Sequence, residues 1–140
     1  MNFTHARQVS DNMDKIVGHW VERARYDLDS AKAMLECNRY LYVAYMCQQA
    51  IERIIKAIIA QEGKDNFPIH NLIRLSEIAE IRDDLSDEIF NFLAELTPYH
   101  IEARYGDYKE SLSEIINGDT AEKLYNKSRE IFQWLYLKIK

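Results

Sequence analysis

The stretch from Tyr42 to Ile59 constrains the fold more than any other part of the sequence. At about 100° per residue, its apolar side chains gather on one face of a helix. This face carries Val43, Cys47, Ala50, Ile51, Ile54, Ile55 and Ile58, and the opposite face carries Tyr45, Gln49, Glu52, Arg53 and Lys56. An apolar face this wide can contact more than one neighbouring helix. The stretch therefore predicts a central helix that other helices cover.

The polar face of this helix allows two interpretations. Gln48 and Gln49 are followed at helical spacing by Glu52 and Lys56. In the first interpretation these side chains face solvent, and Glu52 pairs with Lys56 one turn further on. In the second they form a row of hydrogen-bonding groups that serves a ligand or a partner, because a merely solvated helix does not need such a row. The sequence leaves both open.

Composition favours one all-α domain over residues 1–140. The 140 residues include only 4 glycines and 2 prolines, so few positions interrupt regular structure. A chain of this length fits one domain with one compact core. Residues 1–13 show weak periodicity and are expected to form a frayed or accessory segment.

Helical periodicity predicts an up-and-down bundle of about five helices. The first helix runs from Met13 to about Cys37, and a short turn at Asn38 leads into the second, which predicts an antiparallel hairpin. Asp27 interrupts the apolar stripe of the first helix and either reaches solvent or pairs with a basic group on a neighbour. Gly63 ends the second helix.

Turn signals place the remaining helices. The third begins at Pro68–Asn71, and the fourth begins near Asp83–Ser86. Thr97–Pro98 is expected to interrupt the fourth helix. The last helix follows a turn in which Asp119 and Glu122 have the spacing of a capping box.

Charge and cysteine content narrow the partners. A formal net charge of -5 argues against non-specific electrostatic binding of nucleic acid, because such binding depends on Lys and Arg side chains that neutralise phosphates. No DNA partner is expected, although a local basic groove shared between subunits is left open. Cys37 and Cys47 favour neither a disulfide framework nor a zinc site. No segment resembles a signal peptide or spans a bilayer, so we expect a cytoplasmic protein without a membrane partner.

The sequence lacks the metal-binding motifs His-Glu-x-x-His and Glu-x-x-His. The position three residues before a histidine holds Ile16 for His19, Phe67 for His70 and Thr97 for His100. The sequence also lacks a glycine-rich phosphate loop. We therefore expect neither a metal site nor a cofactor.

The remaining candidates for chemistry are His70–Asn71 and the segment after Pro98. On a helix, His100 and Arg104 share a face and could present an imidazole and a guanidinium to a phosphate. The structural alternative for His70 is a helix-entry residue that bonds backbone groups. For Arg104 it is an ion pair with Glu102, Asp107 or Asp27.

The order of motifs along the chain resembles the HEPN family, the "higher eukaryotes and prokaryotes nucleotide-binding" domain. The resemblance begins near Trp20 and extends to the last helix. Its motifs are Ala24-x-x-Asp27-Leu28-x-x-Ala31, Gln48-Gln49-Ala50-x-Glu52-x-x-x-Lys56-Ala57, His70-Asn71-Leu72-x-x-Leu75 and Ala103-Arg104-Tyr105. The resemblance implies a small helical bundle, commonly a homodimer with a cleft between its subunits.

The resemblance also implies a function. Many prokaryotic HEPN proteins act with a minimal nucleotidyltransferase, often as a toxin and antitoxin pair, which implies a nucleotide or RNA partner. Ribonuclease members carry Arg-x4-6-His, but the corresponding positions after Arg104 hold Lys109, Glu110 and Ser111. This departure from the ribonuclease motif favours a protein that binds rather than catalyses.

Three functional hypotheses follow. The first is a non-catalytic or weakly catalytic module that binds a nucleotide, RNA or a nucleotidyltransferase. Its contacts would come from Gln49, Glu52, Lys56, His70, Asn71, Arg104 and Tyr105. The second is a metal-independent toxin ribonuclease that uses His100 with Arg104. The third is a dimeric protein-interaction module without nucleotide binding.

Overall fold

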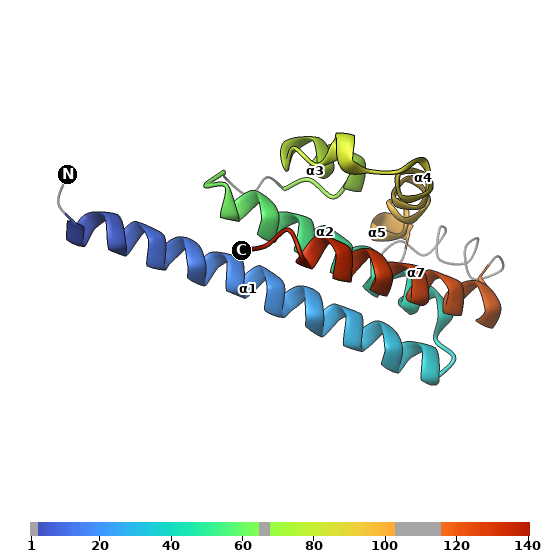
Figure 1. Cartoon of the computed structure of the whole chain (residues 1–140). Coiled ribbons are helices and arrows are strands. Elements are labelled where there is room, and N and C mark those ends of the chain that lie inside the picture. Colours follow the sequence, from blue (N-terminus) through green and yellow to red (C-terminus); the bar gives the residue numbers. More distant parts are fainter. Residues whose placement is uncertain (1–2, 65–67, 103–115) are drawn as a thin grey trace.

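The computed structural model describes the backbone of residues 3–64, 68–102 and 116–140, and the side chains of residues 12–64, 68–100 and 116–140. Throughout this part of the chain the regular elements are helices (Figure 1). This confirms the all-α fold. None of the described helices combines the length and the apolar character needed to cross a bilayer.

The first two helices form the predicted antiparallel hairpin. Helix α1 (Phe3–Glu36) and helix α2 (Tyr40–Gln61) lie side by side and are joined by a tight turn (Figure 1). Asn38 adopts a φ of 60° in this turn, a left-handed conformation that asparagine tolerates better than most residues. The backbone N–H of Arg39 then donates to the carbonyl of Met34 at 2.8 Å, which closes the end of α1.

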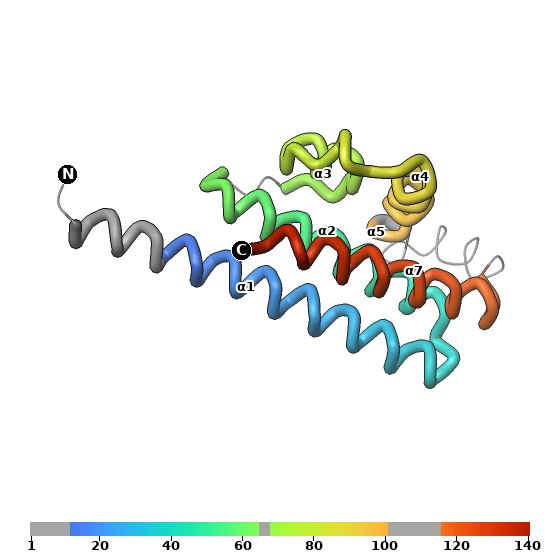
Figure 2. The backbone as a smooth tube through the Cα atoms, in the orientation of Figure 1, coloured from blue at the N-terminus to red at the C-terminus, as the bar shows by residue number. Residues whose placement is uncertain are grey.

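Helix α2 is the centre of the fold. It contacts α1 and α7 (Gly118–Tyr136), and the tube drawing shows these three long helices running alongside one another (Figure 2). It also contacts three shorter helices: α3 (Leu72–Ile78), α4 (Asp87–Leu96) and α5 (Tyr99–Glu102). A 3₁₀ turn, η1 (Arg82–Asp84), connects α3 to α4. Helix α2 is therefore covered by both groups of helices.

The apolar face of α2 is the core of the protein, as the sequence predicts. Ile51, Ile54, Ile55 and Ile59 are fully buried and pack with leucines from α3, α4 and α7. The solvent-facing interpretation of the opposite face is wrong, because Gln48, Gln49, Glu52 and Lys56 are buried as well. The short helices α3, α4 and α5 also pack on α2, which leaves most of this helix without contact with water.

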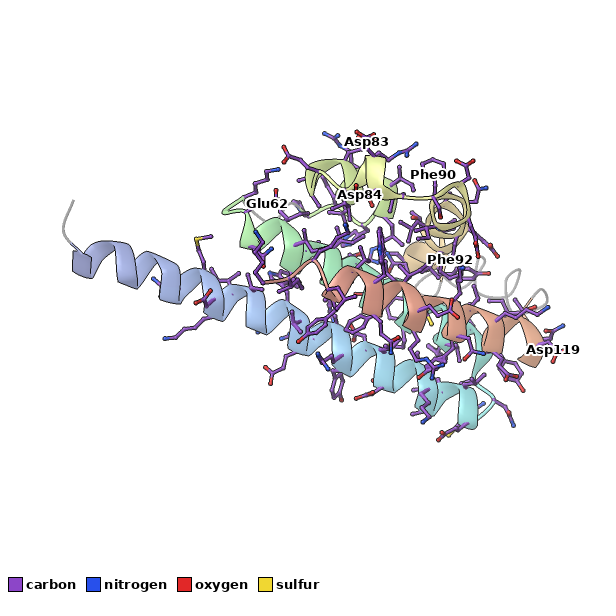
Figure 3. All side chains as sticks on the ribbon, viewed as in Figure 1. Glu62, Asp83, Asp84, Phe90, Phe92 and Asp119 are labelled. Carbon is purple, nitrogen blue, oxygen red and sulfur yellow. The ribbon has the colours of Figure 1, made fainter. Side chains whose placement is uncertain are left out.

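Side-chain caps fix several helix ends. The Ser86 hydroxyl accepts a hydrogen bond from the Ile89 N–H and caps α4, and α4 ends at Leu96, immediately before the predicted break at Pro98. The predicted capping box at Asp119 and Glu122 is wrong. The side chain of Asn117 is the cap of α7, because its oxygen accepts from the Thr120 N–H at 2.9 Å. Asp119 instead lies in the first turn, at the exposed end of α7 (Figure 3). Its negative charge interacts favourably there with the positive end of the helix dipole.

The core position of Ile54 yields a stability prediction with a matched control. Ile54 is fully buried, whereas Ala94 on α4 is exposed. Ile54→Asp places a carboxylate in the core and should cost several kcal/mol, whereas Ala94→Asp should cost about 1 kcal/mol or less. Urea denaturation of both variants measures the difference. Equal transition midpoints would contradict the assigned orientation of α2.

Candidate functional site

Five buried polar side chains and the partly exposed side chain of His70 form one connected group, here called the polar cluster. Four of its members come from α2, one precedes α3 and one belongs to α5. The polar cluster consists of Gln48, Gln49, Glu52, Lys56, His70 and His100. Helical spacing aligns the first four, and the packing of α3 and α5 on α2 brings the two histidines to them.

The Glu52 carboxylate is the hub of the polar cluster. Its Oε2 lies 3.0 Å from Lys56 Nζ, and its Oε1 lies 2.9 Å from His70 Nδ1 and 3.2 Å from Gln48 Nε2. Burial by itself raises the pKa of Glu52, but the hydrogen bond and charge of Lys56, with the hydrogen bonds from His70 and Gln48, outweigh it and lower the pKa below its ordinary 4.5. Glu52 is therefore ionised at neutral pH.

Lys56 forms a buried ion pair with the Glu52 carboxylate. Its side chain is only 7% exposed, and its ammonium lies 5.6 Å from the centre of the Trp20 ring of α1, within the range of a cation–π contact. A lysine held in this way neutralises Glu52 inside the protein. It offers little surface to a ligand.

The two histidines stack on each other. The centres of the His70 and His100 rings are 3.6 Å apart, with 21° between the ring planes. Gln49 Nε2 lies 3.1 Å from His100 Nδ1, and since an amide NH₂ only donates, that ring nitrogen accepts. Gln48 also donates to the backbone carbonyl of His70 at 3.1 Å, which holds the segment before α3 against α2.

The structure unites four of the seven predicted binding residues, namely Gln49, Glu52, Lys56 and His70. Asn71 follows His70 in the chain and caps α3. Its side-chain oxygen accepts from the N–H groups of Ile73 and Arg74, each at 3.0 Å. Arg104 and Tyr105 lie outside the described residues. The predicted binding surface is therefore described only in part.

Two cluster members were absent from the predicted binding set. Gln48 could have been found, because it stands one helical turn before Glu52 on the same row. His100 was a candidate only for ribonuclease chemistry, and the sequence contains no signal that it stacks on His70. That contact depends on how α5 packs against α2.

The described residues include one group with metal-ligand chemistry. Glu52, His70 and His100 each offer one ligand atom, and these atoms lie within 4.8 Å of one another. Motif searches miss this group because its members come from three separate elements. Two imidazoles on one tetrahedral ion, with metal–nitrogen distances of about 2.1 Å, would have ring centres about 5 Å apart. The observed 3.6 Å is the spacing of a stacked pair.

Asp27 belongs to a second ion pair, which is partly buried. It lies 2.6 Å from Arg53 of α2, which confirms pairing with a neighbouring helix and assigns Arg53 as the partner. Burial raises the pKa of Asp27, although the charge and hydrogen bond of Arg53 oppose this. The pair joins α1 to α2 beside the polar cluster.

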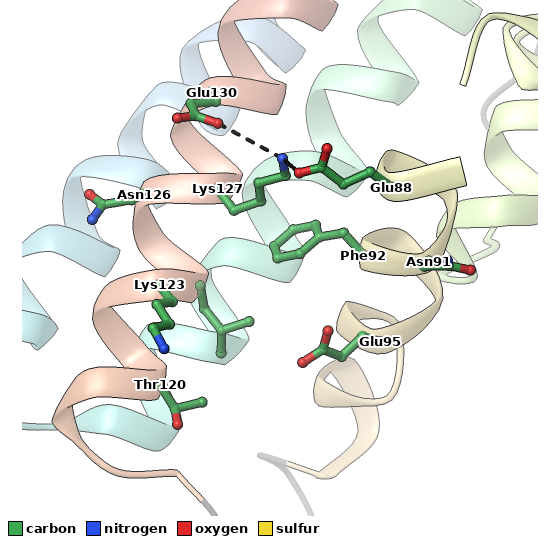
Figure 4. A pocket seen from close by; sticks show the side chains of 10 residues that line it. Glu88, Asn91, Phe92, Glu95, Thr120, Lys123, Asn126, Lys127 and Glu130 are labelled. Atoms are coloured by element: carbon green, nitrogen blue, oxygen red, sulfur yellow. Dashed lines mark hydrogen bonds and ion pairs between the residues drawn. The ribbon is translucent and has the colours of Figure 1, made fainter. Parts of the chain in front are cut away.

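A groove between α4 and α7 is separate from the polar cluster (Figure 4). Its volume is about 640 Å³, and Phe92 and Leu124 form its apolar floor. Lys127 reaches across it to form an ion pair with Glu88 and also contacts Glu130. None of the five predicted binding residues that the structure describes lines this groove. The polar cluster therefore remains the candidate functional site.

The fold and the polar cluster define a compact helical bundle built on one doubly covered helix. Residues 17–139 match the HEPN domain, and the chain belongs to the HEPN family. TT1696 from Thermus thermophilus has a similar structure, with a TM-score of 0.73, 22% sequence identity, and coverage of 87% of this chain and 97% of that one. The archaeal HEPN homologue ST0689 is also similar, with a TM-score of 0.67, 20% identity, and coverage of 89% and 98%. No curated protein sequence matches the chain.

The central role of Glu52 yields a prediction about stability and pH. Glu52→Gln leaves the buried Lys56 ammonium without its counter-ion and should cost roughly 3 to 5 kcal/mol near neutral pH. Because folding lowers the pKa of Glu52, its ionised form stabilises the fold above about pH 4.5, and this contribution is lost as the pH falls through the folded-state pKa. The difference in the free energy of unfolding between wild type and Glu52→Gln should therefore become smaller as the pH falls.

The control is Glu77→Gln, which removes an exposed ion pair with Arg74. It should cost less than about 1 kcal/mol. Urea denaturation of all three proteins between pH 3.5 and 7.5 measures both effects. A Glu52→Gln variant as stable as Glu77→Gln at neutral pH would contradict the assigned role.

Proposed function

We propose that this HEPN protein binds a nucleotide or RNA and acts as the partner of a minimal nucleotidyltransferase, in a pair of the toxin and antitoxin type. It binds its ligand rather than catalysing a reaction. Membership of the HEPN family supports the association with nucleotides, since the motifs that carry the resemblance are the ones that build the polar cluster. Gln49, Glu52 and His70 all belong to those motifs.

The observation that carries the proposal is the organisation of the polar cluster. Its charges compensate each other, and its hydrogen bonds connect three separate elements. A buried network with satisfied partners holds its members in fixed positions. A fixed polar surface with one accessible imidazole suits the recognition of a small polar ligand. Arg104 and Tyr105 follow α5 in the sequence and are proposed to add a phosphate contact and an aromatic contact.

The position of His100 favours binding over ribonuclease activity. A general acid or base must come within hydrogen-bonding distance of the substrate. His100 is only 7% exposed, and Gln49 occupies its Nδ1. The absence of an Arg-x4-6-His spacing from the sequence points the same way. The metal-independent ribonuclease is therefore the less supported alternative.

We also propose a homodimer, as the family resemblance implies. Large apolar side chains are exposed on α1 and at the end of α7, namely Ile16, Tyr26, Tyr136 and Leu137. Tyr136 and Leu137 line one pocket together with Arg25 of α1, which lies 4.5 Å from the centre of the Tyr136 ring, so these two apolar side chains share one side of the bundle. Exposed apolar side chains that gather in this way are typical of protein interfaces.

Sedimentation velocity tests both protein partners. At micromolar concentration the chain alone should sediment as a dimer. Mixed with a minimal nucleotidyltransferase encoded beside its gene, it should form a larger hetero-complex. A monomer at every concentration would contradict the dimer, and unchanged sedimentation in the mixture would contradict the partner.

Nucleotide binding is tested by Arg104→Ala. If its guanidinium holds a phosphate through charge-assisted hydrogen bonds, the substitution removes roughly 1.5 to 3 kcal/mol, a loss of about tenfold to a hundredfold in affinity, with little change in Tm. Calorimetric titrations with mononucleotides and a short RNA measure the loss. Arg74→Ala, which removes an exposed arginine outside the predicted binding set, is the control.

Two results would contradict the proposal. Equal binding by Arg104→Ala and wild type would leave Arg104 without a ligand contact. RNA cleavage by the wild type that disappears in His100→Asn would instead favour the ribonuclease. Asparagine is chosen because it keeps a hydrogen-bonding group near Gln49 while it removes the titratable ring.

A further inference from the structure

His70 is the member of the polar cluster that a ligand can reach. Its side chain is 43% exposed, whereas no other cluster residue exceeds 7% exposure. The buried members bond to one another and to His70. The buried members of the polar cluster therefore hold the His70 ring in place, and that ring is exposed to solvent.

The polar cluster determines which nitrogen of His70 carries the proton. His70 Nδ1 lies 2.9 Å from Glu52 Oε1. A carboxylate only accepts hydrogen bonds, so Nδ1 must carry the hydrogen in this contact. The opposite tautomer would place the lone pair of Nδ1 against a carboxylate oxygen. In the neutral ring, Nε2 therefore has the free lone pair and acts as an acceptor.

The ring is also held in one orientation. His100 stacks on one of its faces at 3.6 Å between ring centres, and Gln48 fixes the His70 backbone through its carbonyl oxygen. Among the residues that the structure describes, Glu52 provides the hydrogen bond to the His70 ring. Nε2 is left to solvent or to a ligand. The same arrangement of carboxylate, Nδ1–H and available Nε2 orients histidines that contact metals and substrates in other proteins.

We infer that His70 Nε2 accepts a hydrogen bond from a donor group of the ligand. On a nucleotide that donor is a ribose hydroxyl or an amino group of the base. The neutral ring does not suit a phosphate at this position, because near neutral pH a phosphate offers mainly acceptor oxygens to a nitrogen lone pair. The inference rests on the proposed nucleotide binding, and it assigns His70 to the nucleoside part of the ligand.

The tautomer is tested without any ligand. Two-dimensional ¹H–¹⁵N spectra that connect ring nitrogens to ring carbons distinguish a protonated Nδ1 from a protonated Nε2. The spectra should show Nδ1–H and an unprotonated Nε2 for His70 at pH 8, with His70→Phe used to assign the signals. A neutral ring protonated at Nε2 would overturn the inference, whatever the protein binds.

Ligand selectivity is tested with the four ribonucleoside 5′-monophosphates and their 2′-deoxy counterparts. His70→Phe keeps an aromatic ring for the stack on His100 but removes the acceptor. His19→Phe makes the same change at an exposed histidine on α1 and is the matched control. Circular dichroism and Tm confirm that both variants are folded.

A lost neutral hydrogen bond should reduce affinity roughly 2- to 10-fold in His70→Phe, but not in His19→Phe. If the donor is the ribose 2′-hydroxyl, wild type should prefer ribonucleotides and the variant should lose this preference. If the donor is a base amino group, wild type should prefer cytidine to uridine monophosphate, and that preference should disappear instead.

The outcomes separate this inference from the proposal on which it rests. If nucleotides bind but His70→Phe keeps the affinity and selectivity of the wild type, the role of His70 is refuted and nucleotide binding stands. If the wild type binds none of the eight nucleotides and no short RNA, both are refuted.

Discussion

The structure depends on the neutralisation of one buried carboxylate. An uncompensated charge at Glu52 would cost several kcal/mol, and the protein compensates it with Lys56 from the same helix and His70 from the segment before α3. The Lys56 contact is local to α2, but the His70 contact requires α3 to pack on the polar face of α2. The carboxylate therefore links the fold of the central helix to the placement of the short helices.

This link is a weak source of stability. A buried ion pair generally stabilises a protein no more than apolar side chains of similar volume would. The apolar face of α2 is buried through its isoleucines. Apolar residues could have been buried on the polar face in the same way. The polar cluster instead orients one accessible imidazole, His70, at the junction of α2 and α3. We interpret that orientation as the reason for the buried charge.

Sequence patterns predicted the parts of the structure that depend on local spacing. The apolar face of α2, the break at Pro98 and the start of α4 near Ser86 all follow from residues within a few positions of each other. The burial of the polar face could not be predicted, because it depends on contacts with residues that lie 22 and 51 positions further along the chain. Motif searches cannot find the stacked histidines either, because His70 and His100 lie far apart in the sequence and meet only in the folded protein. The family resemblance pointed to Gln49, Glu52 and His70, but not to the contacts that they make.

The net charge of -5 limits how such a site can bind a nucleotide. Long-range attraction and counterion release need an excess of basic side chains, and the polar cluster adds none, because Lys56 and Glu52 cancel each other. Affinity must then come from short-range directional contacts, of which hydrogen bonds to held side chains are the clearest example. Such contacts depend on the position of ligand atoms more than on ligand charge. The proposed contacts would therefore distinguish one small ligand from another better than they would hold nucleic acid without regard to sequence.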